Sequence, residues 1–377
     1  MPFSPTATYM LCASHIPALI PYQPKAFAVW QWSNYYHSQI PRGKTMLRLN
    51  LDETSVRLYP GSRKGVVFVG KKRPREAVVH QIPRWKRRCC MTHIGIICDR
   101  TDIQPELPQV IIANESTVPA GLYAALVAAR PRNVRLVRQT SAWNNELLCA
   151  FLVRQLGTIL APYMSEVQPV LSFDSVRLHT TPRVLAACVR AGIWPLVNPP
   201  RMTWLLQPLD THAFLPYKVH LLKAYLRARA ASAAGDVDVE SFLACVYAAI
   251  RQVLQGERWS TAFDRDGFDR DQAGLSATIR RELHIDGPLA VPASRPTAEQ
   301  LALCFPRRAR VPVTSIWKPF DHPSAPPHAP RGRAAAVGVP AVAAASASRI
   351  AAGDRVFGRT RSETRRLTAL AAGRGAP

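Results

Sequence analysis

The stretch that decides the fold runs from Val170 to Lys218 and reads VLSFDSVRLHTTPRVLAACVRAGIWPLVNPPRMTWLLQPLDTHAFLPYK. A short apolar run, Val170 to Phe173, opens it and ends in Asp174. Such a run predicts a buried parallel strand that brings a carboxylate to the carboxyl edge of a sheet. A helix is expected next, because Thr181 is a good N-cap and Pro182 suits the first helical position.

Gly192 is expected to end that helix, and Ile193 to Val197 predicts a second strand, which completes a β-α-β unit. After the loop Asn198-Pro199-Pro200, a further helix is expected to open near Asp210, with Pro208 in its first turn. Asp174 and Asp210 are therefore predicted at a strand end and at a helix start.

This stretch resembles the catalytic domains of the DDE superfamily of transposases, in the branch that includes the pogo and Tigger elements. The resemblance rests on Asp174 with His179, on Asn198-Pro199-Pro200, on Leu205-Leu206-Gln207-Pro208-Leu209-Asp210, and on Phe214 followed by Pro216-Tyr217-Lys218. The family also has an upstream Asp-Glu-Thr triplet on its first strand, which this chain matches at Asp52-Glu53-Thr54. The resemblance covers residues 44–265.

The resemblance implies a ribonuclease-H-like α/β fold, with a mixed five-stranded sheet flanked by helices. It also implies that Asp52, Asp174 and Asp210 are the catalytic and metal-binding residues of one site. Ser175 departs from the family pattern, which commonly has Asn there, and this puts a supporting contact in question rather than a metal ligand. His179 has two open interpretations, a contact to DNA or to the metal's surroundings, and a structural hydrogen bond.

Three aspartates forced together would repel one another, and at least one would hold a proton. Mg²⁺ or Mn²⁺ would remove that conflict, because such hard cations prefer oxygen ligands. Two ions about 3.5–4 Å apart can promote an in-line displacement at phosphorus, which is the chemistry of cutting and rejoining DNA. Taken singly, Asp174 and Asp210 would more often be turn, cap or helix-dipole residues.

The charge of the chain points to a polyanionic partner. The 377 residues contain 49 Lys and Arg against 25 Asp and Glu, which gives a net charge of +24. DNA is the leading candidate, and codon bias toward Arg is the alternative. The eight Cys show no metal-ligand spacing, no apolar run reaches the length of a membrane span, and no secretory signal is recognised.

A basic segment, Lys71 to Arg88, carries eight Lys or Arg and a single Glu, and we call it the basic connector. It is expected to lie in a hairpin loop between two early strands and to contact the DNA backbone. The predicted nucleic-acid-binding residues are Lys71, Lys72, Arg73, Arg84, Lys86, Arg87, Arg88 and Lys218. Lys71 to Arg75 also resembles a nuclear import signal, so the expected location is the nucleus.

Four regions are expected. Residues 1–43 form an N-terminal extension with an aromatic helix near Phe27 to Tyr36, 44–265 the DDE-type catalytic domain, 266–320 a C-terminal extension, and 321–377 a disordered basic tail. Nothing in residues 1–43 is long enough for a helix-turn-helix domain.

The expected function is a metal-dependent DNA endonuclease and strand transferase, a truncated or domesticated transposase without its DNA-reading domain. The alternatives are a catalytically inactive DNA-binding protein on the same fold and a structure-selective nuclease. The expected partner is DNA, with homo-oligomerisation left open and no membrane.

Overall fold

The computed structural model describes residues 22–57, 90–233, 236–306, 309 and 311–321. Within these residues the chain builds one six-stranded sheet in the order β4-β3-β2-β1-β5-β6. The strands are β1 (Thr45–Arg57), β2 (Cys90–Cys98), β3 (Gln109–Asn114), β4 (Val134–Gln139), β5 (Val167–Asp174) and β6 (Trp194–Asn198). β2 runs antiparallel to β1 and β3, whereas β1, β5 and β6 are parallel, as are β3 and β4.

This topology is ribonuclease-H-like: three antiparallel strands, β1 to β3, are extended beyond β1 by two strands parallel to it. The expected fold class is confirmed, but the expected number of five strands is wrong. β4 adds a sixth strand at the edge, because it pairs with β3 along the whole run from Gln109 to Asn114. The early strand expected over residues 65–69 lies outside the described residues.

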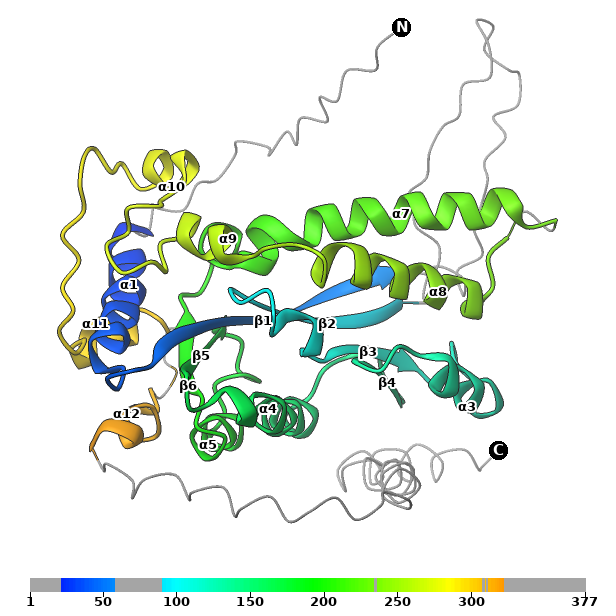
Figure 1. Ribbon diagram of the computed structural model, residues 1–377, viewed down its shortest axis with the longest axis horizontal. Coiled ribbons are helices and arrows are strands. Elements are labelled where there is room, and N and C mark those ends of the chain that lie inside the picture. Colours follow the sequence, from blue (N-terminus) through cyan, green and yellow to red (C-terminus); the bar gives the residue numbers. More distant parts are fainter. Residues whose placement is uncertain (1–21, 58–89, 234–235, 307–308, 310, 322–377) are drawn as a thin grey trace, which may run out of the picture.

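Helices cover both faces of the sheet (Figure 1). The longer ones are α1 (Tyr22–Gln39), α3 (Ala120–Ala129), α4 (Glu146–Leu160), α5 (Pro182–Arg190), α7 (Phe214–Ala231), α8 (Val239–Ala249) and α12 (Val313–Asp321). The shorter ones are α6 (Thr203–Leu206), α9 (Ser260–Arg265), α10 (Ala277–Glu282) and α11 (Ala298–Ala302), with turns η1 (Gln104–Glu106), η2 (Ala161–Tyr163), η3 (Leu209–Ala213) and η4 (Ile250–Leu254). α4 and α5 lie against one face, and α7 and α8 against the other. Because both faces are covered, β5 and β6 are buried almost throughout.

The β-α-β unit expected from the sequence is confirmed in detail. The Thr181 side chain accepts a hydrogen bond from the Val184 amide, and Pro182 occupies the first position of α5. Gly192 follows the helix with a φ of 68°, a left-handed conformation that glycine adopts without a Cβ clash. The sequence also predicts a kink where Pro216 lies inside the helix after Asp210. Immediately before α7, which contains Pro216, the chain forms a π-helical turn, η3. Pro216 lacks an amide hydrogen, so regular α-helical bonding cannot pass through it into that turn.

The aromatic helix expected near Phe27 is α1, and it is embedded rather than peripheral. Trp30 is fully buried, and its indole nitrogen donates to the carbonyl of Asp266 at 3.0 Å. Gly267 has a φ of 83°, and a Cβ there would meet the Trp30 ring at 2.5 Å. Trp32 of the same helix contacts the rings of Tyr36 and Trp317, and all three belong to the same hydrophobic core as the sheet. The expected domain boundaries stay predictions.

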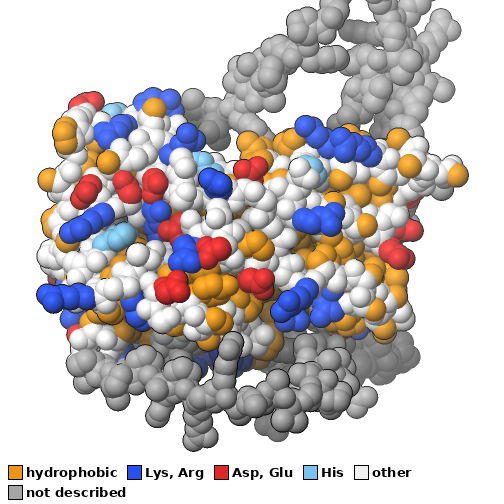
Figure 2. Space-filling view, viewed as in Figure 1, with side chains coloured by type: hydrophobic (Ala, Val, Ile, Leu, Met, Phe, Trp, Pro, Cys, Tyr) orange, Lys and Arg blue, Asp and Glu red, His pale blue; other side chains and the backbone are white. Residues whose placement is uncertain are grey.

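The basic connector and the basic tail over 322–377 lie outside the described residues. None of the described helices combines the length and apolarity that a membrane crossing requires. The described surface mixes basic, acidic and hydrophobic side chains (Figure 2).

Candidate active site

Asp52 lies within the central strand β1, opposite Gly95 of β2. Its side chain is buried, with 7% exposure, in a strand whose other buried residues are mostly apolar. Its carboxylate accepts a hydrogen bond from the Glu53 amide at 2.8 Å. A buried carboxylate with so little compensation is costly to keep in a fold.

Asp174 reaches the same region through the register of β1 and β5. Asn50 pairs with Ser172 in the parallel ladder, and the two aspartates stand two residues beyond that pair on their own strands. Since side chains alternate along a strand, Asp52 shares a face with Asn50, and Asp174 shares a face with Ser172. The register therefore directs the two aspartates to the same end of the sheet.

Asp210 enters from the η3 turn, where the chain passes over the sheet into α7. This approach is close because Gly95, the partner of Asp52, has no side chain. A Cβ at Gly95 would meet Phe214 Cε1 at 3.1 Å and Leu209 Cδ2 at 3.3 Å. The glycine thus lets the segment that carries Asp210 sit directly over the strand pair that carries Asp52.

Asn50 ties together the three elements that carry the aspartates. It is fully buried, and its side-chain nitrogen donates to the carbonyl and the hydroxyl of Ser172, each at 3.1 Å. Its side-chain oxygen accepts from the Leu209 amide at 2.9 Å, one residue before Asp210. One carboxamide therefore links β1, β5 and η3, and we call this set of contacts the Asn50 tie.

A second amide contact holds the same segment to β6. Asn198, which pairs with Asp174 at the end of β5, donates to the side-chain oxygen of Gln207 at 3.0 Å. Both residues are fully buried. Gln207 belongs to the Leu205-to-Asp210 motif and Asn198 to the Asn-Pro-Pro motif, so these two sequence signals meet in one hydrogen bond.

Asp266 fixes the turn that follows Asp210. Its carboxylate accepts from the Thr211 hydroxyl at 2.7 Å and lies 3.1 Å from His212 Nε2. Burial raises the pKa of Asp266, against the opposing effects of His212 and Thr211. The η3 turn is therefore held on both sides of Asp210.

The electrostatics of Asp52 and Asp210 are linked. Burial raises the pKa of Asp52 well above its ordinary value, and the charges of Asp210, Glu53 and Asp174 raise it further. The pKa of Asp210 is raised as well, because the surrounding protein partly removes its carboxylate from water even though the residue is exposed. Thr203, Lys218 and a hydrogen bond with Asp52 oppose this rise. At neutral pH the Asp52 carboxyl therefore holds a proton more readily than an ordinary aspartate does.

His179 lies between two carboxylates and contacts both through its ring nitrogens. Its Nδ1 lies 2.6 Å from Asp174 Oδ1, and its Nε2 lies 3.1 Å from Glu53 Oε1. Burial by itself would lower the pKa of His179, but the hydrogen bonds and charges of these two acids outweigh it and raise the pKa to about 10. The ring is therefore an imidazolium that donates from both nitrogens at neutral pH. Of the two interpretations left open by the sequence, the described contacts are those of a structural hydrogen bond.

The donor chemistry of the three aspartates fits a hard divalent cation, because all three offer carboxylate oxygens and the charges around buried Asp52 are negative. In the described part of the chain, however, no three His, Cys, Asp or Glu side chains are already grouped around a point that could hold a metal ion. Asp174 is hydrogen-bonded to His179, and the pKa of Asp210 responds to a hydrogen-bonding interaction with Asp52. Metal binding would require these side chains to turn.

Of the predicted nucleic-acid-binding residues, Lys218 is the one that the structure describes. It is exposed on α7, its ammonium group lies 5.8 Å from the centroid of the Phe214 ring, and its charge lowers the pKa of Asp210. The others, all within the basic connector, lie outside the described residues. The described residues nearest to the connector on either side, Arg57 and Cys90, pair with each other.

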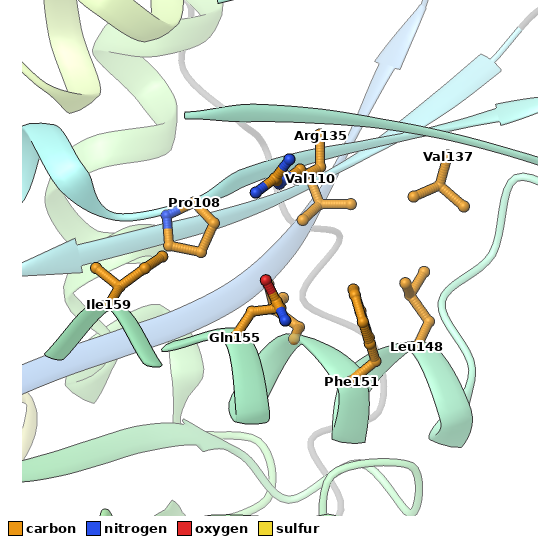
Figure 3. Close-up of a pocket in the computed structure, with 9 residues that line it drawn as sticks. Pro108, Val110, Arg135, Val137, Leu148, Phe151, Gln155 and Ile159 are labelled. Carbon is orange, nitrogen blue, oxygen red and sulfur yellow. The ribbon is translucent and has the colours of Figure 1, made fainter. Parts of the chain in front are cut away.

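A small cavity elsewhere belongs to the hydrophobic packing and not to this site. It lies between α4 and the strands β3 and β4, and Figure 3 shows Phe151, Leu148 and Val137 pointing into it. Its volume is about 30 Å³, room for water but not for a nucleotide. None of the three aspartates lines it.

Sequence reasoning missed Asn50 and Asp266. Asn50 could have been noticed, because it lies two positions before Asp52 on the same face of a strand in which Leu residues alternate with polar ones. Asp266 carried no such signal, since it lies far along the chain in a segment with several acids.

Comparison with known proteins gives structural matches alone. A scan against protein-family models finds no match, and a search of curated proteins finds none. Among solved structures, the chain is similar to the Mos1 transposase paired-end complex with left transposon end, with a TM-score of 0.36 and 14% identity over 70% of this chain and 68% of that chain. It is also similar to a pre-cleavage Mos1 transpososome, with a TM-score of 0.31 and 12% identity over 68% of each chain. A third similar structure is the Mos1 mariner paired end complex with Mn, with a TM-score of 0.30 and 14% identity over 67% of each chain.

Proposed function

We propose that this chain is a metal-dependent DNA endonuclease and strand transferase of the DDE type, related to the pogo and Tigger branch. The observation that carries the proposal is Asp52. It is a buried carboxyl on the central strand, and its pKa is raised by Asp210 and Asp174, the two acids that the sequence motif singles out. Neighbouring carboxylates repel one another, so keeping them together is costly unless a cation binds to them.

In this proposal Asp52, Asp174 and Asp210 hold one or two Mg²⁺ or Mn²⁺ ions. Such ions supply Lewis-acid activation of a phosphodiester and of its attacking oxygen. The chain's own residues position the site: the Asn50 tie sets the spacing between β1, β5 and η3, and Asp266 holds the turn after Asp210. His179 orients the Asp174 carboxylate by holding one of its oxygens and leaves the other free to turn outward.

DNA is the proposed substrate. A net charge of +24 favours binding to phosphates, and Lys218 places a cation near Asp210. The basic connector is proposed to add phosphate contacts that carry affinity but no base readout. Nuclear location, through Lys71 to Arg75, is part of the same proposal.

The test is nicking of supercoiled plasmid by the purified full chain, with and without Mg²⁺ or Mn²⁺. Asp52→Asn, Asp174→Asn and Asp210→Asn should each lower the rate by at least about 100-fold, which corresponds to ~2.7 kcal/mol of barrier. Asp286→Asn removes an exposed acid outside the site and is the matched control. Nicking that persists in all three variants would reject the proposal.

The same experiment separates the second candidate, an inactive DNA-binding protein on this fold. The observation that favours it is that the Asp174 carboxylate is already hydrogen-bonded to His179. Electron paramagnetic resonance of added Mn²⁺ decides between the two. Plasmid binding without either nicking or Mn²⁺ uptake would establish the inactive form.

A further inference from the structure

The outer face of α7 carries an exposed row of large hydrophobic side chains. They are Leu215, Val219, Leu222 and Leu226, with exposures of 70%, 44%, 41% and 51%. Their spacings of four, three and four residues are those of the a and d positions of a heptad. At 100° per residue the row falls within about 60° of the helix circumference, and we call it the α7 stripe.

The α7 stripe is not the face that holds the helix in the fold. Tyr217, Leu221 and Tyr225 form the buried face, which points to the other side of the helix. A helix at a protein surface ordinarily presents polar residues opposite its buried face. A continuous apolar stripe there is typical of an interaction site.

Basic side chains flank the stripe. Lys223 and Arg227 are exposed along one side, and no ion pair of theirs occurs among the described residues. Lys218 lies along the other side, over the Phe214 ring. Figure 2 shows basic and hydrophobic side chains next to one another over the region where α7 and α8 lie in Figure 1.

We propose that the α7 stripe docks an acidic amphipathic helix of a partner protein. Leucine-type side chains of that helix would pack between the four stripe residues, as knobs pack into holes. Asp or Glu side chains beside them would face Lys223 and Arg227, which steers association and sets the partner's register. This inference is independent of the proposed nuclease activity, because it concerns a different face of the helix.

A second copy of this chain is a poorer occupant. Each α7 would bring Lys223 and Arg227 against the same residues of the other copy, and each copy carries a net charge of +24. Duplex DNA is poorer still, because four aliphatic side chains offer no hydrogen bond to phosphate.

The experiment titrates the full chain into a fluorescein-labelled three-heptad peptide with Leu at a and d and Glu at e and g, at about 0.15 M salt. Saturable binding is expected by fluorescence anisotropy. The double variant Leu215→Gln and Leu222→Gln should bind at least about tenfold more weakly, because it loses apolar burial at the centre of the contact. The double variant Leu147→Gln and Val313→Gln changes two exposed hydrophobic residues elsewhere, with exposures of 40% and 38%, and should bind like the unaltered chain.

The unaltered chain and both variants carry the same charge. If the stripe variant binds the peptide as tightly as the unaltered chain, the binding is non-specific attraction of an acidic peptide to a basic protein, and the proposal is overturned. Equal affinity for a peptide with Gln in place of Glu would overturn the acidic partner. Sedimentation that shows a dimer for the unaltered chain and a monomer for the stripe variant would assign the stripe to a second copy. A loss of duplex affinity in the stripe variant would assign it to DNA.

Discussion

Replacing Asn50 with Leu should disconnect the segment that carries Asp210 from the two strands that carry the other aspartates. Leu has a similar volume, so the main loss is hydrogen bonding and not packing. The Leu209 amide would lose its acceptor at 2.9 Å, and the Ser172 carbonyl would lose a donor at 3.1 Å. The Ser172 hydroxyl keeps its own bond to the Leu49 carbonyl.

The magnitude follows from these hydrogen bonds. A buried amide hydrogen without an acceptor costs about 1–3 kcal/mol, and the loss of a further hydrogen bond adds about 1 kcal/mol. The free energy of unfolding, measured by urea denaturation, should therefore fall by about 2–4 kcal/mol. Plasmid nicking should fall much further than the folded fraction does, because Asp210 loses its fixed distance from Asp52.

The control is Leu136→Ala on the edge strand β4, where a core truncation costs a comparable ~2–5 kcal/mol away from the aspartates. Both variants are assayed at a temperature at which both are folded. If Asn50→Leu nicks DNA as fast as Leu136→Ala, Asn50 contributes to stability alone. If Asn50→Leu is as stable as the unaltered chain, the hydrogen-bond argument itself is wrong.

Three further predictions follow from single features. Gly95→Ala should lower the free energy of unfolding by about 1–3 kcal/mol, because the added methyl group meets Phe214 at 3.1 Å. Gly121→Ala is the control, because the space around Gly121 is open, and it should not lower that free energy. Equal effects of the two variants on urea denaturation would contradict this prediction. Burial lowers the pKa of His93 to about 4, below its unfolded value of about 6.5, so stability should fall by up to about 3 kcal/mol as pH drops between these values, and His93→Gln should remove that part of the pH profile. Affinity for unrelated DNA duplexes should be similar and strongly salt-dependent, and replacing Arg84, Lys86, Arg87 and Arg88 with Ala should flatten the salt slope by about 0.9 for each DNA phosphate that the variant no longer neutralises; an unchanged slope would mean that the basic connector does not touch DNA.

The sequence predicted the elements around the site well, for local reasons. Thr181, Pro182 and Gly192 specify the start and end of α5 by their own backbone preferences, and the apolar run before Asp174 can be buried only as a central strand. The sixth strand could not be counted in the same way. Apolar and polar residues alternate at the start of β4 as they do in any edge strand. Only its long-range pairing with β3 shows that it belongs to this sheet.

The sequence suggested the residues of the candidate site but could not predict how they are arranged. Asp52 and Asp210 are far apart in sequence, and their mutual effect on pKa depends on how closely η3 approaches β1. Gly95 allows that approach because it has no side chain, and Asn50 fixes it because its side-chain oxygen accepts a hydrogen bond from the Leu209 amide. Neither residue bears on the chemistry by itself, so no catalytic motif points to either of them.

The motif residues themselves divide into two kinds once their contacts are known. Asp174 and Asp210 present carboxylates, whereas Asn198 and Gln207 face each other in the core and hold β6 to the η3 segment. Asn50 adds a second amide tether from β1 to the same segment. An amide suits this task because it donates and accepts at once without adding charge beside three acids. In this chain Asn50, Asn198 and Gln207 are neutral, fully buried tethers of this kind beside the three aspartates.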